Sequence, residues 1–239
     1  MPYLAPILND PLLAAVFWSA ATIAVYLVAK RAYRRWRRWW LMPLALAPIM
    51  LVVVVLALHT SYHDYIRGTH WIVALLGPAT VAFAVPIYEQ RALIRRYWPV
   101  LAFAMVAGSI TSMATAWALA SVLGLNDALR LSLLPRSIST PFAMAVSGEI
   151  GGVPDLTAVF VVITGILGAV IGEVMLARFP VRSAMARGVL LGVSAHGAGT
   201  AKAHEMGREE GSIAGLVMVL VGLFNVLFAP VLAMGLHYI

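Results

Sequence analysis

The chain has 239 residues, of which 62% are hydrophobic and only 11% charged, and its formal net charge at pH 7 is +7. Soluble domains carry about 25% charged residues, so this composition excludes an ordinary soluble protein and predicts one integral membrane domain over residues 1–239. The positive charge does not indicate nucleic-acid binding, because 12 of the 17 Lys and Arg residues fall in three short segments beside apolar runs.

Six apolar runs are long enough to cross a bilayer as helices of about 20 residues. They cover residues 11–29, 41–58, 71–88, 100–123, 156–177 and 212–237. The basic segments Lys30–Arg38, Arg91–Arg96 and Arg178–Arg187 are typical of cytoplasmic loops. The sequence therefore predicts an external N-terminus and external loops at 59–70 and 124–130.

Two further segments, 131–152 and 188–206, combine hydroxyls and helix-breaking residues with a cation between long apolar runs. A bilayer accommodates a broken backbone and a charge only where protein or a water-filled cavity surrounds them. The count of crossings between Asn126 and Arg178 leaves no room for 131–152 as a full span. We therefore expect both segments to be broken or re-entrant, and the fold to be an all-α integral membrane protein.

A short internal repeat relates the two segments. Ser139–Ala143 aligns with Gly199–Ala203, 60 residues further along, and an apolar run with a central glycine follows each copy. One net crossing per copy gives the copies opposite orientations, the arrangement of inverted-repeat transporters. The alternative is that small residues recur wherever membrane helices pack.

In the first segment, Pro135 and Pro141 each remove a backbone donor and disfavour helix just before them. A helix that restarts here exposes N–H groups that attract anions, and Arg136 adds a forked donor for a carboxylate. The predicted substrate-binding residues of this segment are Arg136, Ser137, Ser139, Thr140 and Pro141. The alternative places Arg136 at the membrane interface, with the hydroxyls bonded to their own backbone.

The second segment supplies the other half of the predicted anion site. Its candidate residues are Ser194, His196, Gly197, Gly199, Thr200 and Lys202. His196 titrates near neutrality and is the first candidate for proton coupling, with Glu149 as the second. The alternatives are a structural histidine, and a local ion pair between Lys202 and Glu205 three residues away.

A third break, with Gly77, Pro78 and Thr80, is a candidate for lining a cavity, although helix packing explains it equally well. We expect no enzymatic activity, metal or cofactor, because no nucleophile–base pair or metal-ligand cluster stands out in the sequence.

Four segments closely resemble the LrgB/CidB family of bacterial membrane proteins. They are Leu75–Val81, Leu133–Ala145, Glu149–Ile171 and Gly192–Gly211. This family forms the larger partner of the LrgA/LrgB and CidA/CidB pairs, and was first described as holin- or antiholin-like, controlling murein hydrolase activity and lysis. A plant relative is a plastid glycolate/glycerate translocator, and bacterial pairs have been linked to pyruvate uptake.

The resemblance implies a secondary transporter for small 2-oxo or 2-hydroxy monocarboxylates, such as pyruvate, lactate, glycolate or glycerate. The alternative that it leaves open is a holin- or antiholin-like regulator of lysis. It also implies a multi-pass protein of the bacterial inner membrane, in contact with lipid, that forms a homo-oligomer or binds a small LrgA/CidA-like partner. Nucleic acid is not among the expected partners.

Overall fold

The structure is a computed structural model that describes residues 10–236, and every regular element within that range is helical. By their internal contacts the residues separate into two compact units, Met1–Ala79 and Thr80–Ile239, which are described here one at a time. The prediction of a single membrane domain stays a prediction, while the expected all-α membrane architecture is confirmed.

Five helical stretches are long and apolar enough to cross a membrane, where the sequence predicted about six. They are Pro11–Trp36, Tyr62–Glu89, Arg91–Val122, Pro154–Arg178 and Arg208–Gly235. The difference lies at 41–58, where helix α3 (Pro43–Ala57) has 15 residues. At about 1.5 Å per residue this helix is about 22 Å long, less than a hydrocarbon core of about 30 Å.

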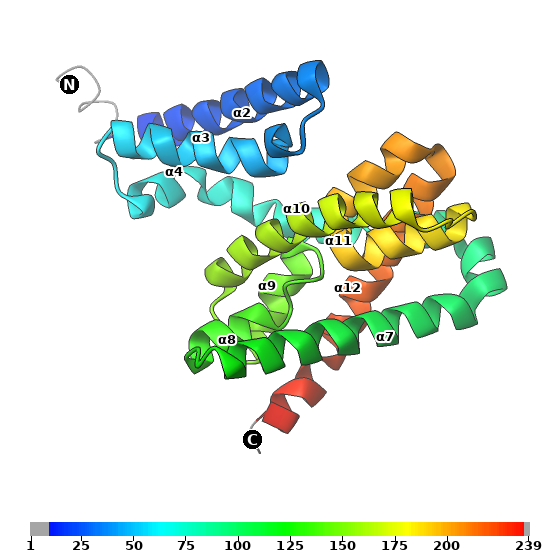
Figure 1. Ribbon diagram of the computed structural model, residues 1–239. Helices are drawn as coiled ribbons and strands as arrows, with labels where there is room; N and C mark the ends of the chain where they lie inside the picture. The colour runs from blue at the N-terminus through cyan, green and yellow to red at the C-terminus, as the bar shows by residue number, and fades with distance from the viewer. Residues whose placement is uncertain (1–9, 237–239) are drawn as a thin grey trace. The chain divides into compact units, whose positions relative to one another are not determined.

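The first unit is built around α2 (Pro11–Trp36), which packs against both α3 and α4 (Tyr62–Ala74) (Figure 1). The Asp10 carboxylate accepts hydrogen bonds from the first amides of α2, and Pro11 occupies its first turn. Trp18 is fully buried, with its ring edge-on to Tyr65 of α4. The same interface holds Ser19, whose hydroxyl accepts a 2.7 Å hydrogen bond from the Trp71 indole.

The predicted external loop at 59–70 is mostly helix, which corrects the sequence interpretation. Ser61 caps α4 through a hydrogen bond from the Asp64 amide, and the helix then continues through Gly68. Polar residues do not stop a helix whose backbone hydrogen bonds are internal, so hydropathy alone misplaced its start. Short helices α5 (Leu76–Ala82) and α6 (Ala84–Glu89) follow, with the boundary between the two units inside α5.

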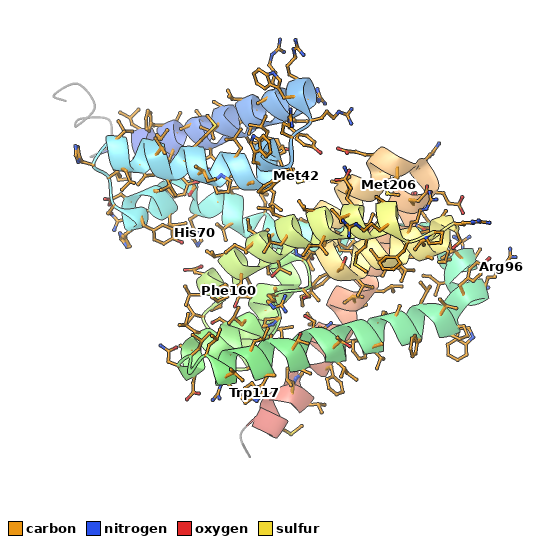
Figure 2. All side chains as sticks on the ribbon, viewed as in Figure 1. Met42, His70, Arg96, Trp117, Phe160 and Met206 are labelled. Atoms are coloured by element: carbon orange, nitrogen blue, oxygen red, sulfur yellow. The ribbon has the colours of Figure 1, made fainter. Side chains whose placement is uncertain are left out.

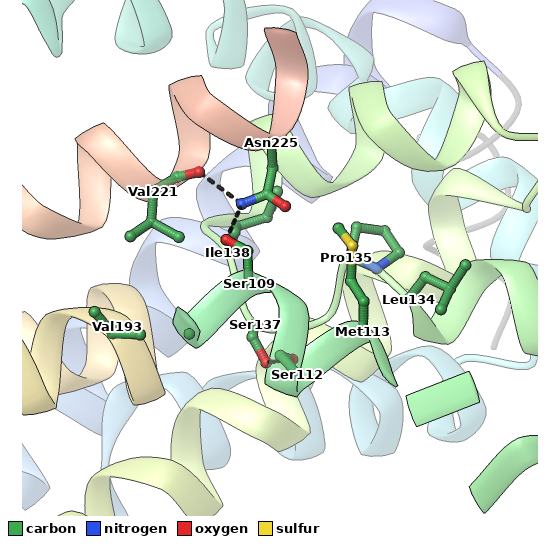
Figure 3. A pocket seen from close by; sticks show the side chains of 11 residues that line it. Ser109, Ser112, Met113, Leu134, Pro135, Ser137, Ile138, Val193, Val221 and Asn225 are labelled. Atoms are coloured by element: carbon green, nitrogen blue, oxygen red, sulfur yellow. Dashed lines mark hydrogen bonds between the residues drawn. The ribbon is translucent and has the colours of Figure 1, made fainter. Parts of the chain in front are cut away.

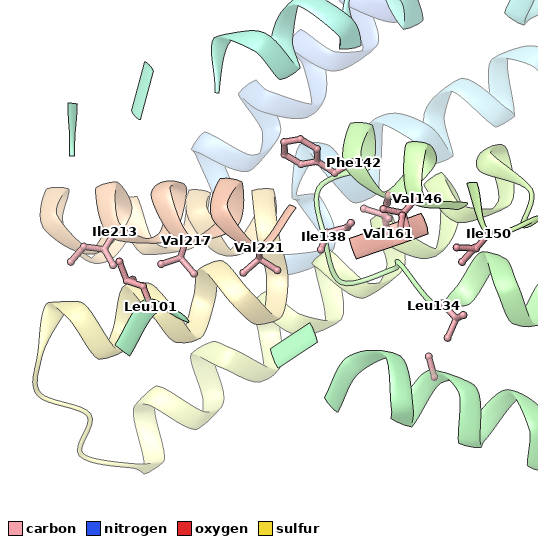
Figure 4. Packing of buried hydrophobic residues seen from close by; sticks show 13 residues of the cluster. Leu101, Leu134, Ile138, Phe142, Val146, Ile150, Val161, Ile213, Val217 and Val221 are labelled. Atoms are coloured by element: carbon pink, nitrogen blue, oxygen red, sulfur yellow. The ribbon is translucent and has the colours of Figure 1, made fainter. Parts of the chain in front are cut away.

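The second unit contains α7 (Arg91–Val122), α8 (Asp127–Leu133), α9 (Thr140–Glu149), α10 (Pro154–Arg178), α11 (Ala184–Met206) and α12 (Arg208–Leu236). Helix α11 lies between α10 and α12, and α9 contacts α10 and α12 (Figure 1). Buried apolar side chains from α7, α9, α10 and α12 form one core, in which Phe142, Val161 and Val217 are members (Figure 4).

Small residues allow the helices of this core to approach closely. A Cβ added to Gly168 of α10 would lie 2.7 Å from the Ser194 carbonyl oxygen of α11, and one on Gly192 would lie 2.5 Å from the Ala214 oxygen of α12. Packing of this kind is how helices associate where lipid removes the hydrophobic driving force. The outward faces stay apolar: side chains project away from α7 and α10 (Figure 2), and Phe103, Ile110, Ile163 and Leu167 are exposed there.

Candidate functional site

The first predicted break is present between α8 and α9. Helix α8 ends at Leu133 and α9 begins at Thr140, so residues 134–139 form turns that interrupt the helix at the two predicted prolines. Ser139 occupies the N-cap of α9 with an extended backbone, but its side chain caps no amide. The sequence pattern of Pro135 and Pro141 thus predicted the position of the break correctly.

Two polar side chains in this break have no partner among residues 10–236. The Arg136 guanidinium is half-buried and makes no hydrogen bond or ion pair within that part of the chain. The Ser139 side chain is 7% exposed, and its hydroxyl oxygen is buried without a hydrogen bond. Unpaired polar groups in an apolar interior cost free energy, so Arg136 and Ser139 are the candidates in this break for binding a ligand.

A cluster of buried hydroxyls holds the break in place. The Thr157 hydroxyl of α10 lies 2.7 Å from the Ser147 oxygen and 3.0 Å from the Ser132 carbonyl oxygen, and the Ser132 hydroxyl accepts a 2.8 Å bond from the Val153 amide. These bonds connect α8, α9 and the start of α10. Because all three side chains are buried, the cluster fixes the break as part of a rigid unit.

The second predicted break is a sharp bend within α11 at His196. Its backbone angles, φ 38° and ψ −119°, are not helical, and positive φ is uncommon for a residue other than glycine. A Cβ on Gly199 would clash with the Leu191 carbonyl oxygen, eight residues earlier. The second half of α11 therefore turns back against the first half, and only a glycine leaves room for that contact.

The His196 ring is enclosed by α10. The residue is 4% exposed, and its Nε2 atom has no hydrogen-bond partner among residues 10–236. A Cβ on Gly165 would lie 2.6 Å from the ring carbon Cε1, so the missing side chain at Gly165 makes the space that the ring occupies. The ring also lies within reach of the Val161 backbone.

The other candidates of the second break are already engaged by the chain. Lys202 is 16% exposed at its side chain, and its Nζ lies 2.7 Å from a Glu173 oxygen on α10 and 3.4 Å from a Glu205 oxygen. The hydroxyls of Ser194 and Thr200 donate to the backbone carbonyls one turn earlier. The structure thus supports the local ion-pair alternative for Lys202 and adds an interhelical partner that the sequence did not indicate.

Glycines near the centres of α10 and α12 face ring side chains of the two polar segments, 188–206 and 131–152. Gly165 of α10, which follows the first break, faces His196 in the second break. Gly222 of α12, which follows the second break, faces the Phe142 ring of α9, the helix that begins after the first break. The 60-residue repeat aligns His196 with Arg136 and Phe142 with Lys202, so the two contacts are not equivalent and the inverted repeat stays a prediction.

A small cavity lies beside the first break, with a volume of about 10 Å³ (Figure 3). Its lining combines Ser109 and Ser112 of α7, Ser137 of the break and Asn225 of α12 with apolar side chains. Of the residues predicted to bind substrate, only Ser137 lines it. The sequence did show a signal for Asn225, an amide inside the last apolar run, because polar groups at membrane depth are functional candidates.

The structure does not gather all the predicted site residues into one place. The cavity includes no residue of the second break's candidate set, since Val193 is the α11 side chain that lines it. Glu149 is exposed at the end of α9. Gly77 and Pro78 belong to the first unit and Thr80 to the second, so their predicted cavity-lining role stays a prediction.

Comparison with known proteins identifies the family. Residues 22–234 match the model of the LrgB-like family. The chain is 41% identical over 211 residues to "Uncharacterized protein YwbG" of Bacillus subtilis (strain 168), covering 88% of this chain and 94% of that protein.

Two further relatives carry functional names. The "Antiholin-like protein LrgB" of Bacillus subtilis (strain 168) is 32% identical over 90% of this chain and 94% of its own length. The "Holin-like protein CidB" of Staphylococcus epidermidis (strain ATCC 12228 / FDA PCI 1200) is 30% identical over 92% of this chain and 96% of its own length. No solved structure matches the chain. The family match covers residues 22–234, and five helical stretches are long and apolar enough to cross a membrane. This chain therefore belongs to the LrgB-like family of multi-pass membrane proteins.

Proposed function

We propose that the protein is a secondary transporter for small monocarboxylate anions of the pyruvate, lactate, glycolate or glycerate class, in a bacterial cytoplasmic membrane. The observation that carries the proposal is the half-buried Arg136 guanidinium, which has no partner among residues 10–236. A cation held in an apolar protein without a counter-charge is expensive, and a functional ligand is the usual reason for keeping it.

Further groups that suit an anion lie close to Arg136 along the chain. Ser139, three residues further on, offers a buried hydroxyl without a partner at the N-terminus of α9. Helix N-termini attract negative charge through their free amides and dipole. A forked guanidinium, a hydroxyl and free amides together match the two oxygens of a carboxylate.

The cavity beside the break is too small for a whole carboxylate, since about 10 Å³ holds about one water molecule. The proposal therefore assigns this structure to an occluded state of the transport cycle. Binding from either side of the membrane requires the helices around the first break to separate, as expected for alternating access around a fixed site.

A second candidate function is holin-like or antiholin-like control of lysis, and the names of the relatives support it more directly than they support transport of any carboxylate. Such a protein would act as a pore or as a regulator of one, without a need for a carboxylate site. The expected homo-oligomer, or a complex with a small LrgA/CidA-like partner, belongs to this candidate in particular.

One experiment separates the two candidates. The purified protein is placed in liposomes, and the uptake of radiolabelled pyruvate, lactate, glycolate and glycerate is measured with and without a pH gradient. In parallel, liposomes loaded with a fluorescent dye report on leakage. Saturable uptake of a carboxylate without dye leakage supports the transporter. Dye leakage, or no saturable uptake of any of the four acids, rejects the transporter and leaves the holin-like function.

A further inference from the structure

The amide of Asn225 in the cavity has one orientation. Its Nδ2 atom donates to the Val221 carbonyl oxygen at 2.7 Å and to the Ser109 hydroxyl at 2.8 Å. A backbone carbonyl only accepts, so the nitrogen must face Val221. The side-chain oxygen is turned away from these two partners (Figure 3), and it accepts no hydrogen bond from the described part of the chain.

The serine hydroxyls leave two hydrogens without acceptors. The Ser109 oxygen accepts from Asn225, while its own hydrogen has no acceptor among residues 10–236. The oxygens of Ser112 and Ser137 lie 2.5 Å apart, so one hydroxyl donates to the other. The second hydroxyl of that pair keeps a free hydrogen, because one hydrogen suffices for the bond.

The side chains that line this space of about 10 Å³ thus carry two hydrogen donors and one acceptor without a partner among residues 10–236. Apolar side chains complete the lining, including Met113, Leu134 and Val193. A hydroxyl group complements this arrangement fully, since it accepts two hydrogen bonds and donates one. A keto oxygen accepts two bonds but leaves the Asn225 oxygen without a donor, and a methylene group satisfies none of the three.

We propose that this cavity is a specificity subsite that receives the 2-hydroxyl group of the substrate. The inference rests on the proposed carboxylate transport: it assigns the carboxylate to Arg136 and the 2-hydroxyl group to the cavity, which is lined by Ser137, the next residue along the chain. The subsite favours 2-hydroxy acids over 2-oxo acids, and both over unsubstituted acids. Asn225 determines the first preference, because its oxygen is the acceptor that only a hydroxyl satisfies.

The test uses three acids with the same three-carbon skeleton: lactate, pyruvate and propionate. Their apparent affinities are measured by competition with the uptake of radiolabelled lactate into liposomes that contain the full chain. We expect lactate to bind about tenfold more tightly than pyruvate, and pyruvate about tenfold more tightly than propionate, about one hydrogen bond per step.

Two variants test the two preferences of the subsite separately. Asn225→Leu removes the acceptor and brings the lactate-to-pyruvate ratio close to one. Ser109→Ala removes a donor that both oxygens use, so it weakens lactate and pyruvate by a similar factor and leaves propionate unchanged. The matched control is Thr115→Val on α7, the helix that carries Ser109. Thr115 is exposed, and its hydroxyl donates to the carbonyls of Thr111 and Ser112.

Failure of the inference differs from failure of the proposed function. If the wild-type protein takes up none of pyruvate, lactate, glycolate and glycerate, carboxylate transport is rejected and the subsite with it. If it takes up carboxylates but Asn225→Leu and Ser109→Ala keep the wild-type ratios, the cavity encloses a structural water only. The second result overturns the subsite while transport stands, and thermal unfolding of each variant shows that it is folded.

Discussion

Replacing Arg136 by glutamine tests the anion site most directly. Glutamine keeps a polar side chain of similar length but removes the charge and the forked donor. A hydrogen bond to a charged group contributes about 1.5–3 kcal/mol, so we expect the dissociation constant for the substrate to rise by about 10- to 150-fold. Stability should change little, because the Arg136 side chain has no hydrogen bond or ion pair to lose within residues 10–236.

The magnitude follows from the environment of the side chain. Two unit charges about 4 Å apart attract by about 4 kcal/mol at an effective dielectric constant of about 20. Part of this energy is offset by desolvation of the carboxylate, and Arg136 is only half-buried. The net value therefore falls within the range of a charge-assisted hydrogen bond rather than at the full Coulomb energy.

The assay measures the concentration dependence of carboxylate uptake into liposomes, with thermal unfolding in detergent as the measure of stability. Arg136→Lys should recover part of the affinity, because it restores the charge without the fork. Arg67→Gln is the control, since Arg67 is exposed on α4. Wild-type affinity in the Arg136→Gln protein, with Arg67→Gln equally silent, would refute the anion site.

Three further predictions concern the second break and the helix α10 that packs against it. Gly165→Ala should destabilise the protein by about 1–3 kcal/mol in a denaturation experiment, because its Cβ would lie 2.6 Å from the His196 ring, whereas Gly197→Ala has no atom within 4 Å to meet and should be tolerated. Lys202→Glu should lower the thermal midpoint by breaking the 2.7 Å ion pair with Glu173, and adding Glu173→Lys should restore part of it, because Glu205 still repels the new glutamate. Since Glu173 is 55% exposed, we expect a coupling of about 0.5–1 kcal/mol, and a coupling of zero in the double-mutant cycle would contradict the pair. His196→Gln should remove the pH dependence of uptake if the ring carries the coupled proton, and an unchanged pH profile would move attention to Glu149.

The sequence by itself determined the class of the protein and the places where its helices break. Whether a segment enters a bilayer depends on its own hydropathy and on the charges beside it. The sequence alone therefore identifies the apolar runs and the basic segments. The breaks at Pro135 and Pro141 follow from the ring of proline, which removes a donor at its own position wherever the chain goes. The family motifs are equally local, and the comparison with known proteins confirmed the family that they indicated.

Only the tertiary structure decided which polar groups are satisfied. Arg136 and Lys202 are equivalent in the sequence, one cation in each break, yet the fold brings Glu173 to Lys202 and nothing to Arg136 within residues 10–236. The meeting of Ser109, Ser137 and Asn225 depends in the same way on packing between helices that are far apart in the chain. Whether a charge or a hydroxyl is paired depends on its neighbours in space. Helix packing determines those neighbours, and small residues such as Gly168 and Gly192 determine how the helices pack.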